Sequence, residues 1–564
     1  MKLFRKISML ICAMAVLLAG CASGGSNPRQ AGSDQSQPAR SSAPKRVTAA
    51  IRGEPKVLSN MISRAGAGRV YGVNEIEMII HTGLSIADDQ GEQQPMLAES
   101  VPSVENGLWK VLPDGRMETI WKIRQNAKWQ DGTPLTAEDL VFTAQVIREL
   151  PEFHEVAFTS IDSVTAPDPR TVVVSWSKPF IWANTMFSGT RGVPQPKHLL
   201  EKSFQEDKAA YTQLPFWSDA YVGAGAYKIR DFVRGSHMVV MAFDGFVLGK
   251  PKIDEIEIKF LPDANSVAAN ILSGLIDLTL VGQGTLSIEQ ALQVRDQWRD
   301  GTLTPVLAGS VGAFPQFINP SPAIIAEPQF RRALLMSIDR QLMIDTLQSG
   351  LSEIAHTNFT PQNAEYKDIQ GYLVRYDYDP RRSMQMIEEL GYARAPDGFF
   401  RDGAGQRLNV ELRSTPGREV NESVTLSMAE HWQRIGVGVD TVIMPLQRNQ
   451  DREYRSTRPG FEVVGQPDDL IRFHSAEIPT AEGRYIGDNR TRYSNPELDA
   501  LVDRYYVTIP RAERVQVLGQ ILNHVTDRVV LLSLFYEAGP IMAANRMQNI
   551  TSVPTWNVYA WDVR

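Results

Sequence analysis

Residues 129–142 read WQDGTPLTAEDLVF, a pattern that predicts a tight turn followed by a capped helix. Residues 119–124 alternate between polar and apolar side chains and predict the strand before the turn. Asp131-Gly132 has turn chemistry, because glycine adopts a positive φ without steric cost. Thr136 precedes the helical run and Asp139 follows three residues later, which predicts a capping box with Asp in place of the usual Glu or Gln. A strand, turn and helix without ligand contact explain all these residues, so the stretch bears on the fold.

The length and composition predict a soluble globular protein of three or four structural units. The chain has 564 residues, of which 43% are hydrophobic and 22% are charged. The net charge is −7 and becomes −10 if residues 1–20 are removed, because three cations leave with them. An acidic body argues against nucleic acid as a partner, since phosphate binding needs a basic face.

The N-terminus predicts export and lipid anchoring. Lys2, Arg5 and Lys6 precede an apolar run of 13 residues, which is too short to span a bilayer as a stable helix. The run ends in Leu18-Ala-Gly-Cys21, which resembles the bacterial lipobox, so we expect residues 1–20 to be a signal peptide and Cys21 to be acylated. The alternative is a plain secretory signal in which Cys21 is incidental. Because Cys12 would leave with the signal, the mature protein would have no disulfide.

Residues 21–46 are predicted to be a disordered tether that ends where the folded body begins. After Cys21 they are mostly Ser, Gly, Pro, Gln, Ala and Arg, almost without large apolar side chains. Such a segment has a root-mean-square reach of roughly 25–30 Å. We therefore expect a body held at the extracytoplasmic side of a membrane, on the cell surface or in the periplasm.

From residue 47 onward, predicted strands and helices alternate, which is typical of an α/β protein with more than one lobe. Asp263, Asp379-Pro380 and Asn495-Pro496 predict helix starts. Residues 328–347 carry apolar side chains at helical spacing, which predicts helical structure.

Catalytic constellations are not evident in the sequence. None of the eight histidines occurs in H-x-x-H or H-E-x-x-H spacing, and no G-x-S-x-G elbow is present. Gly223-Ala-Gly225 lacks the rest of a dinucleotide fingerprint and is interpreted as a turn. The pairs Asp88-Asp89 and Asp468-Asp469 are typical of solvated loop charges. We therefore expect a protein that is not an enzyme and that needs no metal or cofactor.

Six segments in order resemble the family-five solute-binding proteins of ABC importers, the oligopeptide-, dipeptide- and nickel-binding receptors. The segments are residues 129–142, GAGAYKIRDFVRGS (223–236) with GKPKID (249–254), FLPDAN (260–265) with LSGLID (272–277), FRRALLMSIDR (330–340), YDP (378–380) with LGY (390–392), and YSNPELDAL (493–501). Together they cover nearly the whole chain after the tether.

The resemblance implies a class II periplasmic-binding-protein-like fold, with two α/β lobes joined by two crossovers and a ligand in the cleft. Lobe one would take residues 47–308, with an accessory subdomain at about 75–195, and lobe two residues 309–536. Residues 537–564 would return to lobe one. The crossovers are expected near 309–319 and 534–545.

The resemblance also implies cleft contacts. In peptide-binding members, an Asp after a Trp-containing loop of lobe two pairs with the α-amine of the ligand. The corresponding loop here is 464–470, in which Gln466 stands where Trp is usual and Asp468 or Asp469 supplies the carboxylate. Four further positions are expected near the ligand: Tyr71, Asn74, Phe314 and Arg418. Core packing or surface polarity is the alternative for each of them.

These observations favour a monomeric lipoprotein that captures a solute, by preference a peptide, and delivers it to the membrane subunits of an ABC permease. An envelope hydrolase is one alternative, and a sensor or scaffold that keeps the fold without transport is another. The sequence leaves the ligand open among a peptide, an opine, a sugar, haem and a chelated metal.

Overall fold

The computed structural model describes residues 43–65, 70–153, 155–282, 284–414, 419–445, 448, 451–466 and 468–564. The predicted signal peptide, Cys21 and most of the predicted tether lie outside the described residues. Residues 44–564 pack together as one unit. Across the described ranges, no helix combines the length and apolar character that crossing a bilayer requires.

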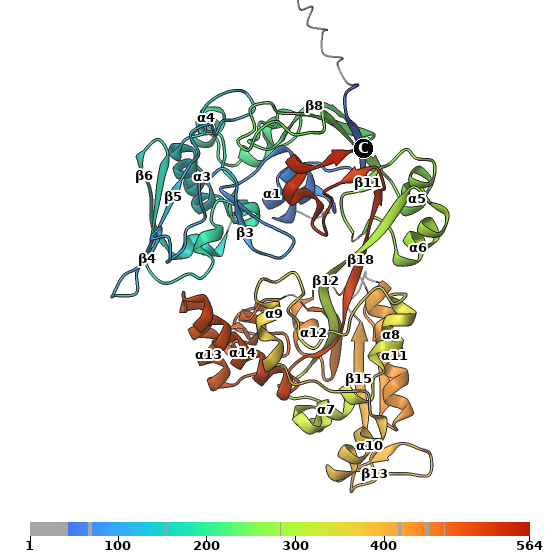
Figure 1. The fold of residues 1–564 in the computed structure, drawn as a ribbon. Coiled ribbons are helices and arrows are strands. Elements are labelled where there is room, and N and C mark those ends of the chain that lie inside the picture. The colour runs from blue at the N-terminus through green and yellow to red at the C-terminus, as the bar shows by residue number, and fades with distance from the viewer. Residues whose placement is uncertain are drawn as a thin grey trace, which may run out of the picture. The chain divides into compact units, whose positions relative to one another are not determined.

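A ten-stranded mixed sheet runs through this unit, in the order β16-β15-β17-β12-β18-β11-β1-β10-β9-β8. Figure 1 shows β8 and β11 in the upper part of the molecule and β15 in the lower part. The strands are β1 (Arg46–Arg52), β8 (Tyr227–Val233), β9 (His237–Ala242), β10 (Glu255–Leu261), β11 (Leu278–Thr279), β12 (Gly301–Pro315), β15 (Asn409–Ser414), β16 (Gly438–Ile443), β17 (Phe461–Gln466) and β18 (Leu532–Ala544).

The strands β12 and β18 connect the two parts. They pair antiparallel from Gly301 opposite Ala544 to Ala313 opposite Leu532, with register shifts near Ser310 and Gly312. Figure 1 shows them running side by side from one part into the other. The expected crossovers at 309–319 and 534–545 overlap these strands, and the expected domain boundaries stay predictions.

A second sheet, in the order β4-β5-β7-β6, belongs to the upper part. Its strands are β4 (Trp109–Val111), β5 (Met117–Lys122), β6 (Ile161–Asp168) and β7 (Thr171–Trp176), and helix α3 (Ala137–Glu149) packs on β6 and β7. The predicted capping box of α3 is confirmed, because the Thr136 N–H donates to Asp139 Oδ2 at 2.8 Å. Trp129 is fully buried beneath this turn, as a structural residue should be.

The remaining α-helices described in the upper part are α1 (Asn60–Ala65), α2 (Val73–Ile80), α4 (Lys197–Glu206), α5 (Ala264–Leu272) and α6 (Ile288–Gln297). Those of the lower part are α7 (Pro328–Met336), α8 (Arg340–Leu347), α9 (Tyr366–Ile369), α10 (Pro380–Glu389), α11 (Glu419–Arg434), α12 (Arg452–Ser456), α13 (Pro496–Val507) and α14 (Arg511–Asp527). Two-stranded sheets complete the fold: β2 (Ser85–Ala87) with β3 (Gln93–Pro95), β13 (Ala393–Arg394) with β14 (Phe400–Arg401), and β19 (Met547–Gln548) with β20 (Asp562–Val563).

The predicted helix starts are confirmed, and the helical run predicted over 328–347 divides into two helices. Asp263, Asp379 and Asn495 each accept a backbone N–H from the residue three positions on, at 2.8–2.9 Å. Within 328–347, the Asp339 carboxylate accepts the Leu342 N–H at 2.9 Å and caps a new helix, so the run divides into α7 and α8. A short acidic side chain stabilises a helix start better than a helix interior, and here it outweighs the continuous apolar spacing.

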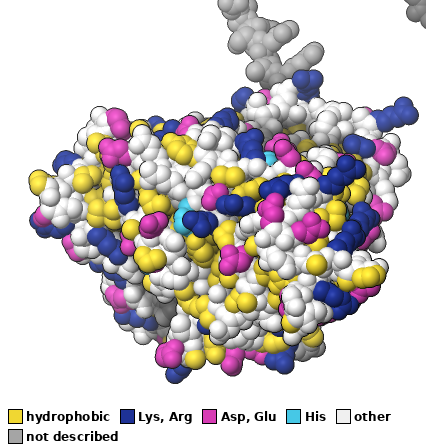
Figure 2. Space-filling view, turned by 90° about the horizontal axis from the view of Figure 1, so that it is seen from below, with side chains coloured by type: hydrophobic (Ala, Val, Ile, Leu, Met, Phe, Trp, Pro, Cys, Tyr) yellow, Lys and Arg dark blue, Asp and Glu magenta, His cyan; other side chains and the backbone are white. Residues whose placement is uncertain are grey.

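The surface carries charges of both signs. On the face seen from below, Lys and Arg side chains lie interspersed with Asp and Glu (Figure 2). Ion pairs of the lower part include Arg382 with Glu389, Arg401 with Asp397, and Arg332 with Asp527. Because these pairs are exposed, each contributes little to stability.

Candidate ligand-binding cavity

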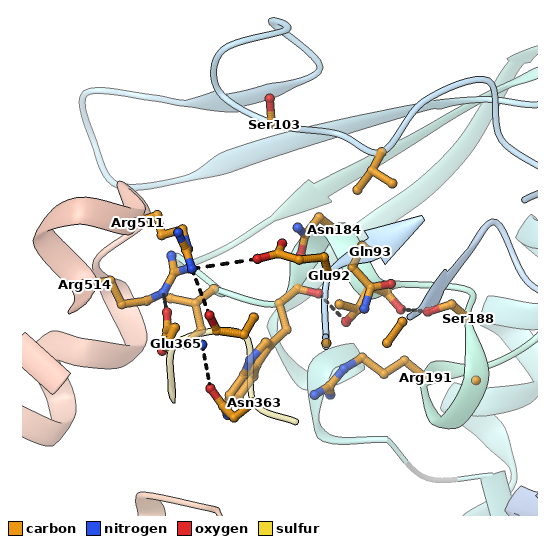
Figure 3. A pocket seen from close by; sticks show the side chains of 18 of the residues that line it. Glu92, Gln93, Ser103, Asn184, Ser188, Arg191, Asn363, Glu365, Arg511 and Arg514 are labelled. Carbon is orange, nitrogen blue, oxygen red and sulfur yellow. Dashed lines mark hydrogen bonds and ion pairs between the residues drawn. The ribbon is translucent and has the colours of Figure 1, made fainter. Parts of the chain in front are cut away.

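A cavity of about 990 Å³ lies between the upper and lower parts of the unit. This volume is at the upper end of the range of about 300–1,000 Å³ that is usual for ligand sites. The upper part contributes side chains from α2, the β2–β3 hairpin, the start of β4, the loop before β4 and the segment after β7: Asn74, Met78, Glu92, Gln93, Ser103, Trp109, Trp182, Asn184, Ser188 and Arg191. The lower part contributes Phe359, Gln362, Asn363, Glu365, Asp468, Tyr505, Tyr506, Arg511 and Arg514. Figure 3 shows several of these side chains converging on the space between the two sets.

Aromatic side chains meet across this cavity. The Trp182 ring of the upper part lies edge-on to the Tyr506 ring of α13, with centroids 5.4 Å apart. The Arg191 guanidinium lies 5.0 Å from the Trp182 ring centroid and forms an ion pair with Glu155 at 2.6 Å. The upper part and the helix pair α13–α14 therefore already touch at one wall of the cavity.

Charges along the lower wall are largely paired. Arg514 Nε lies 3.0 Å from Glu365 Oε1, and the Tyr505 hydroxyl donates to Glu365 Oε2 at 3.0 Å. Arg511 pairs with Asp368 at 3.0 Å and lies 3.8 Å from Glu92 of the upper part (Figure 3). Burial raises the pKa of Tyr505 and of Tyr506, so both phenols are neutral hydrogen-bond donors at physiological pH. This wall thus presents aromatic rings, amides and hydroxyls more than free charge.

Two of the predicted contact residues line the cavity. Asn74 lies on α2 and its amide oxygen accepts a hydrogen bond from Asn60 at 3.2 Å. Asp468 lies after β17, is exposed, and accepts a hydrogen bond from the Asn363 amide at 3.3 Å. Asp468 is therefore an accessible carboxylate on the lower wall.

Asp469 lies beside the cavity and is not among its lining residues. Its carboxylate accepts the Tyr506 hydroxyl and the Ile471 N–H, each at 3.1 Å. It therefore holds the ring of Tyr506 against Trp182 and leaves Asp468 as the freer of the two carboxylates.

The other predicted positions lie elsewhere. Phe314 is 2% exposed on β12, opposite Glu462 of β17. Tyr71 is 44% exposed and its ring packs over Gly284. Neither lines the cavity, and Arg418 lies outside the described residues.

Gln466, at the position where Trp was expected, points into the sheet. Its side chain is fully buried, and its Oε1 accepts the hydroxyls of Ser310 at 3.0 Å and Ser533 at 2.8 Å. The amide thus ties β17 to β12 and β18 close to their register shift.

Several lining residues carried no sequence signal. Trp182, Asn184 and Arg191 lie in turns of the upper part, and Asn363 lies in a loop of the lower part. Tyr505 and Tyr506 lie on α13, the helix whose start Asn495-Pro496 predicted, but a helix start does not show which residues of the helix reach a cavity. Within the part of the chain that the structure describes, no group of three or more His, Cys, Asp or Glu side chains is arranged to hold a metal ion.

Residues 92–466 match the family model described as "Bacterial extracellular solute-binding proteins, family 5 Middle". The chain belongs to this family. One similar family-5 relative is the oligopeptide-binding protein AppA of Bacillus subtilis, which is 22% identical over 517 residues, or 90% of this chain and 89% of the relative.

Solved structures show the same fold. The B. subtilis AppA structure, in complex with a nonapeptide, has a TM-score of 0.66 at 20% identity and covers 93% of this chain and 100% of its own. NikA from Brucella suis, in complex with Fe(III)-EDTA, has a TM-score of 0.72 at 18% identity and covers 92% and 100%. The chain therefore has the two-lobed α/β periplasmic-binding fold of family 5, as its sequence resemblance predicted. The upper part is the first lobe and the lower part is the second.

Proposed function

We propose that this family-5 protein captures a peptide outside the cytoplasm by closing its two lobes and delivers it to the membrane subunits of an ABC permease. The observation that carries the proposal is the shared cavity, to which both lobes contribute side chains. A ligand that touches both walls favours the closed arrangement, so closure can signal occupancy to a permease.

The composition of the cavity supports a peptide as the solute. Amide and hydroxyl side chains such as Gln93, Asn184 and Asn363 can pair with peptide groups, and aromatic rings can pack on side chains. The relative AppA is named as an oligopeptide-binding protein and its structure holds a nonapeptide. The fold alone does not identify the solute, because the NikA structure has the same fold and holds Fe(III)-EDTA.

Asp468 is the proposed partner of the peptide's α-amine. Its carboxylate is exposed at the cavity, and among the described residues no Lys or Arg lies within ion-pair distance of it. A hydrogen bond to a charged group contributes about 1.5–3 kcal/mol, which corresponds to roughly 10- to 100-fold in affinity.

The experiment compares free and N-acetylated peptides on the wild type and on Asp468→Asn. Calorimetry on a nonapeptide pool first identifies a binding sequence. We expect acetylation and Asp468→Asn each to weaken binding roughly 10-fold or more, and the two together to cost little more than either alone. Asp296→Asn on the exposed face of α6 is the control. Additive losses would show that Asp468 and the amine do not interact.

Lipid anchoring at Cys21 and a monomeric state belong to the same proposal. The support for the lipid anchoring is the charged start, the short apolar run and Leu18-Ala-Gly-Cys21. Metabolic labelling with a radioactive fatty acid should mark the wild type and not Cys21→Ser, and the variant should leave the membrane fraction. Labelling that persists in Cys21→Ser would refute the assignment.

A further inference from the structure

The turn of the β2–β3 hairpin is preorganised by its own first residue. Asp88 Oδ1 accepts the backbone N–H groups of Gln90 at 2.9 Å and Glu92 at 3.0 Å, and Oδ2 accepts the Gln94 side-chain amide at 2.8 Å. The neighbouring Asp89 makes no comparable contact among the described residues. Residues 88–92 are therefore ordered by hydrogen bonds within the hairpin itself.

This turn lies against the backbone of the other lobe. Gly91 has φ +78°, and a Cβ placed on it would lie 2.5 Å from the Gln362 carbonyl oxygen and 3.0 Å from the Ala364 nitrogen. Backbone atoms cannot yield as a flexible side chain can. The two lobes thus approach so closely here that a side chain as small as methyl does not fit between them.

Side chains on either side of Gly91 extend the contact. Lys367 Nζ donates to Gln90 Oε1 at 3.4 Å, and Arg511 lies 3.8 Å from Glu92 while it also donates to the Ala364 carbonyl at 2.9 Å. Figure 3 shows Glu92 and Arg511 facing each other. Such exposed pairs contribute little individually, so the backbone fit at Gly91 sets the geometry.

The contact also borders the cavity. Gly91, Glu92, Gln362, Ala364 and Arg511 are all among its lining residues. The turn therefore meets the second lobe at the wall of the cavity.

We propose that residues 88–92 form a clasp that locks the two lobes together over the cavity and sets how long a ligand is retained. The clasp depends on the proposed function in one respect, which is that the retained ligand is a peptide. Contacts that exist only when the lobes meet stabilise the closed arrangement selectively, and ligand escape requires their loss. Because the turn is already ordered by Asp88, little entropy is lost when the contact forms.

The first test compares Gly91→Ala with Gly115→Ala in the full chain. Gly115 lies in the β4–β5 turn with φ +86°, so alanine meets a similar backbone strain there, but nothing lies within 4 Å of its added Cβ. Small-angle scattering should give a larger radius of gyration for Gly91→Ala only. A fluorescein-labelled nonapeptide pool should dissociate roughly 10-fold faster from Gly91→Ala than from Gly115→Ala. Melting temperatures of the two variants show that both are folded.

A second pair of variants separates the effect of the Asp88 hydrogen bonds from the effect of the negative charge. Asp88→Ala removes the acceptor that builds the clasp, whereas Asp89→Ala removes the same charge from the same turn and leaves the clasp bonded. We expect faster peptide dissociation only in Asp88→Ala.

The outcomes distinguish the two proposals. If the wild type binds no peptide of the pool, the proposed function fails and scattering alone decides on the clasp. If peptides bind but Gly91→Ala matches Gly115→Ala in scattering and in dissociation, the clasp is refuted and the function stands.

Discussion

Glu77 is a buried carboxyl group whose replacement by Gln should stabilise the protein above neutral pH. It lies on α2 with 5% of its surface exposed; its Oε2 accepts the Asn60 N–H at 2.9 Å and its Oε1 the Tyr221 hydroxyl at 3.3 Å. Burial raises the pKa of Glu77 from 4.5 to about 7, and the two hydrogen bonds offset only part of this effect.

The sign and size of the effect follow from linkage. A carboxyl whose pKa is raised on folding binds its proton more tightly in the native state, so its contribution is full below pH 4.5 and is lost as pH rises through about 7. One pKa unit corresponds to about 1.4 kcal/mol, so raising the pKa of Glu77 from 4.5 to about 7 changes the free energy of unfolding by about 3 kcal/mol in total. About 2.5 kcal/mol of this change falls between pH 5 and pH 8. In Glu77→Gln the side-chain amide oxygen still accepts the Asn60 N–H, but the group carries no charge at any of these pH values.

Urea unfolding followed by tryptophan fluorescence at pH 5, 6, 7 and 8 measures this difference. The advantage of Glu77→Gln over the wild type should grow by about 2.5 kcal/mol from pH 5 to pH 8. Glu388→Gln, at an exposed position of α10, should show no such trend. If the difference between Glu77→Gln and the wild type were the same at pH 5 and pH 8, burial would not be raising this pKa.

Three further substitutions test buried polar contacts described above. Arg514→Met leaves the Glu365 carboxylate buried without its cation and should lower the free energy of unfolding by about 3–5 kcal/mol, while adding Glu365→Gln should recover most of the loss in the same urea titration. Gln466→Leu leaves the Ser310 and Ser533 hydroxyls without their acceptor and should cost about 1–3 kcal/mol, whereas an unchanged melting temperature would contradict the bonding described. Asp139→Ala removes the acceptor of the Thr136 and Lys197 N–H groups and should cost about 2 kcal/mol, measured as a fall in urea midpoint that Asp162→Ala on the exposed edge of β6 does not share.

Local chemistry made part of the structure predictable. A helix start depends on residues within one turn of each other, as at Asp263, Asp379 and Asn495. The capping box at Thr136 depends on such neighbours too. The order of the ten-stranded sheet depends on pairings such as Leu278 with Ala543, which no local pattern encodes. The two-lobed fold was therefore predicted from resemblance to a family and not from periodicity, and the strand order was not predicted from the sequence.

The cavity was harder to predict for the same reason. Asn74 and Asp468 were predicted because the family resemblance places cleft contacts near these positions. Trp182 and Tyr506 come from elements 324 positions apart in the sequence that happen to meet at the lobe boundary. Gln466 shows the opposite case. The resemblance predicted a cleft loop at this position, but Gln466 is the last residue of β17 and its side chain is buried.

The paired strands β12 and β18 have a consequence for the mechanics of the molecule. A ribbon of two hydrogen-bonded strands resists stretching and sliding, so bending and twisting are the motions left to the lobes it joins. Two flexible loops would allow many relative orientations, each of which a ligand would have to exclude at an entropic cost. A joint with few degrees of freedom instead limits that cost before any ligand arrives. A one-residue deletion in β12 would turn the inward-facing side chains beyond it to the opposite face of the sheet, so the joint should be far less tolerant of changes in length than of changes in side chain.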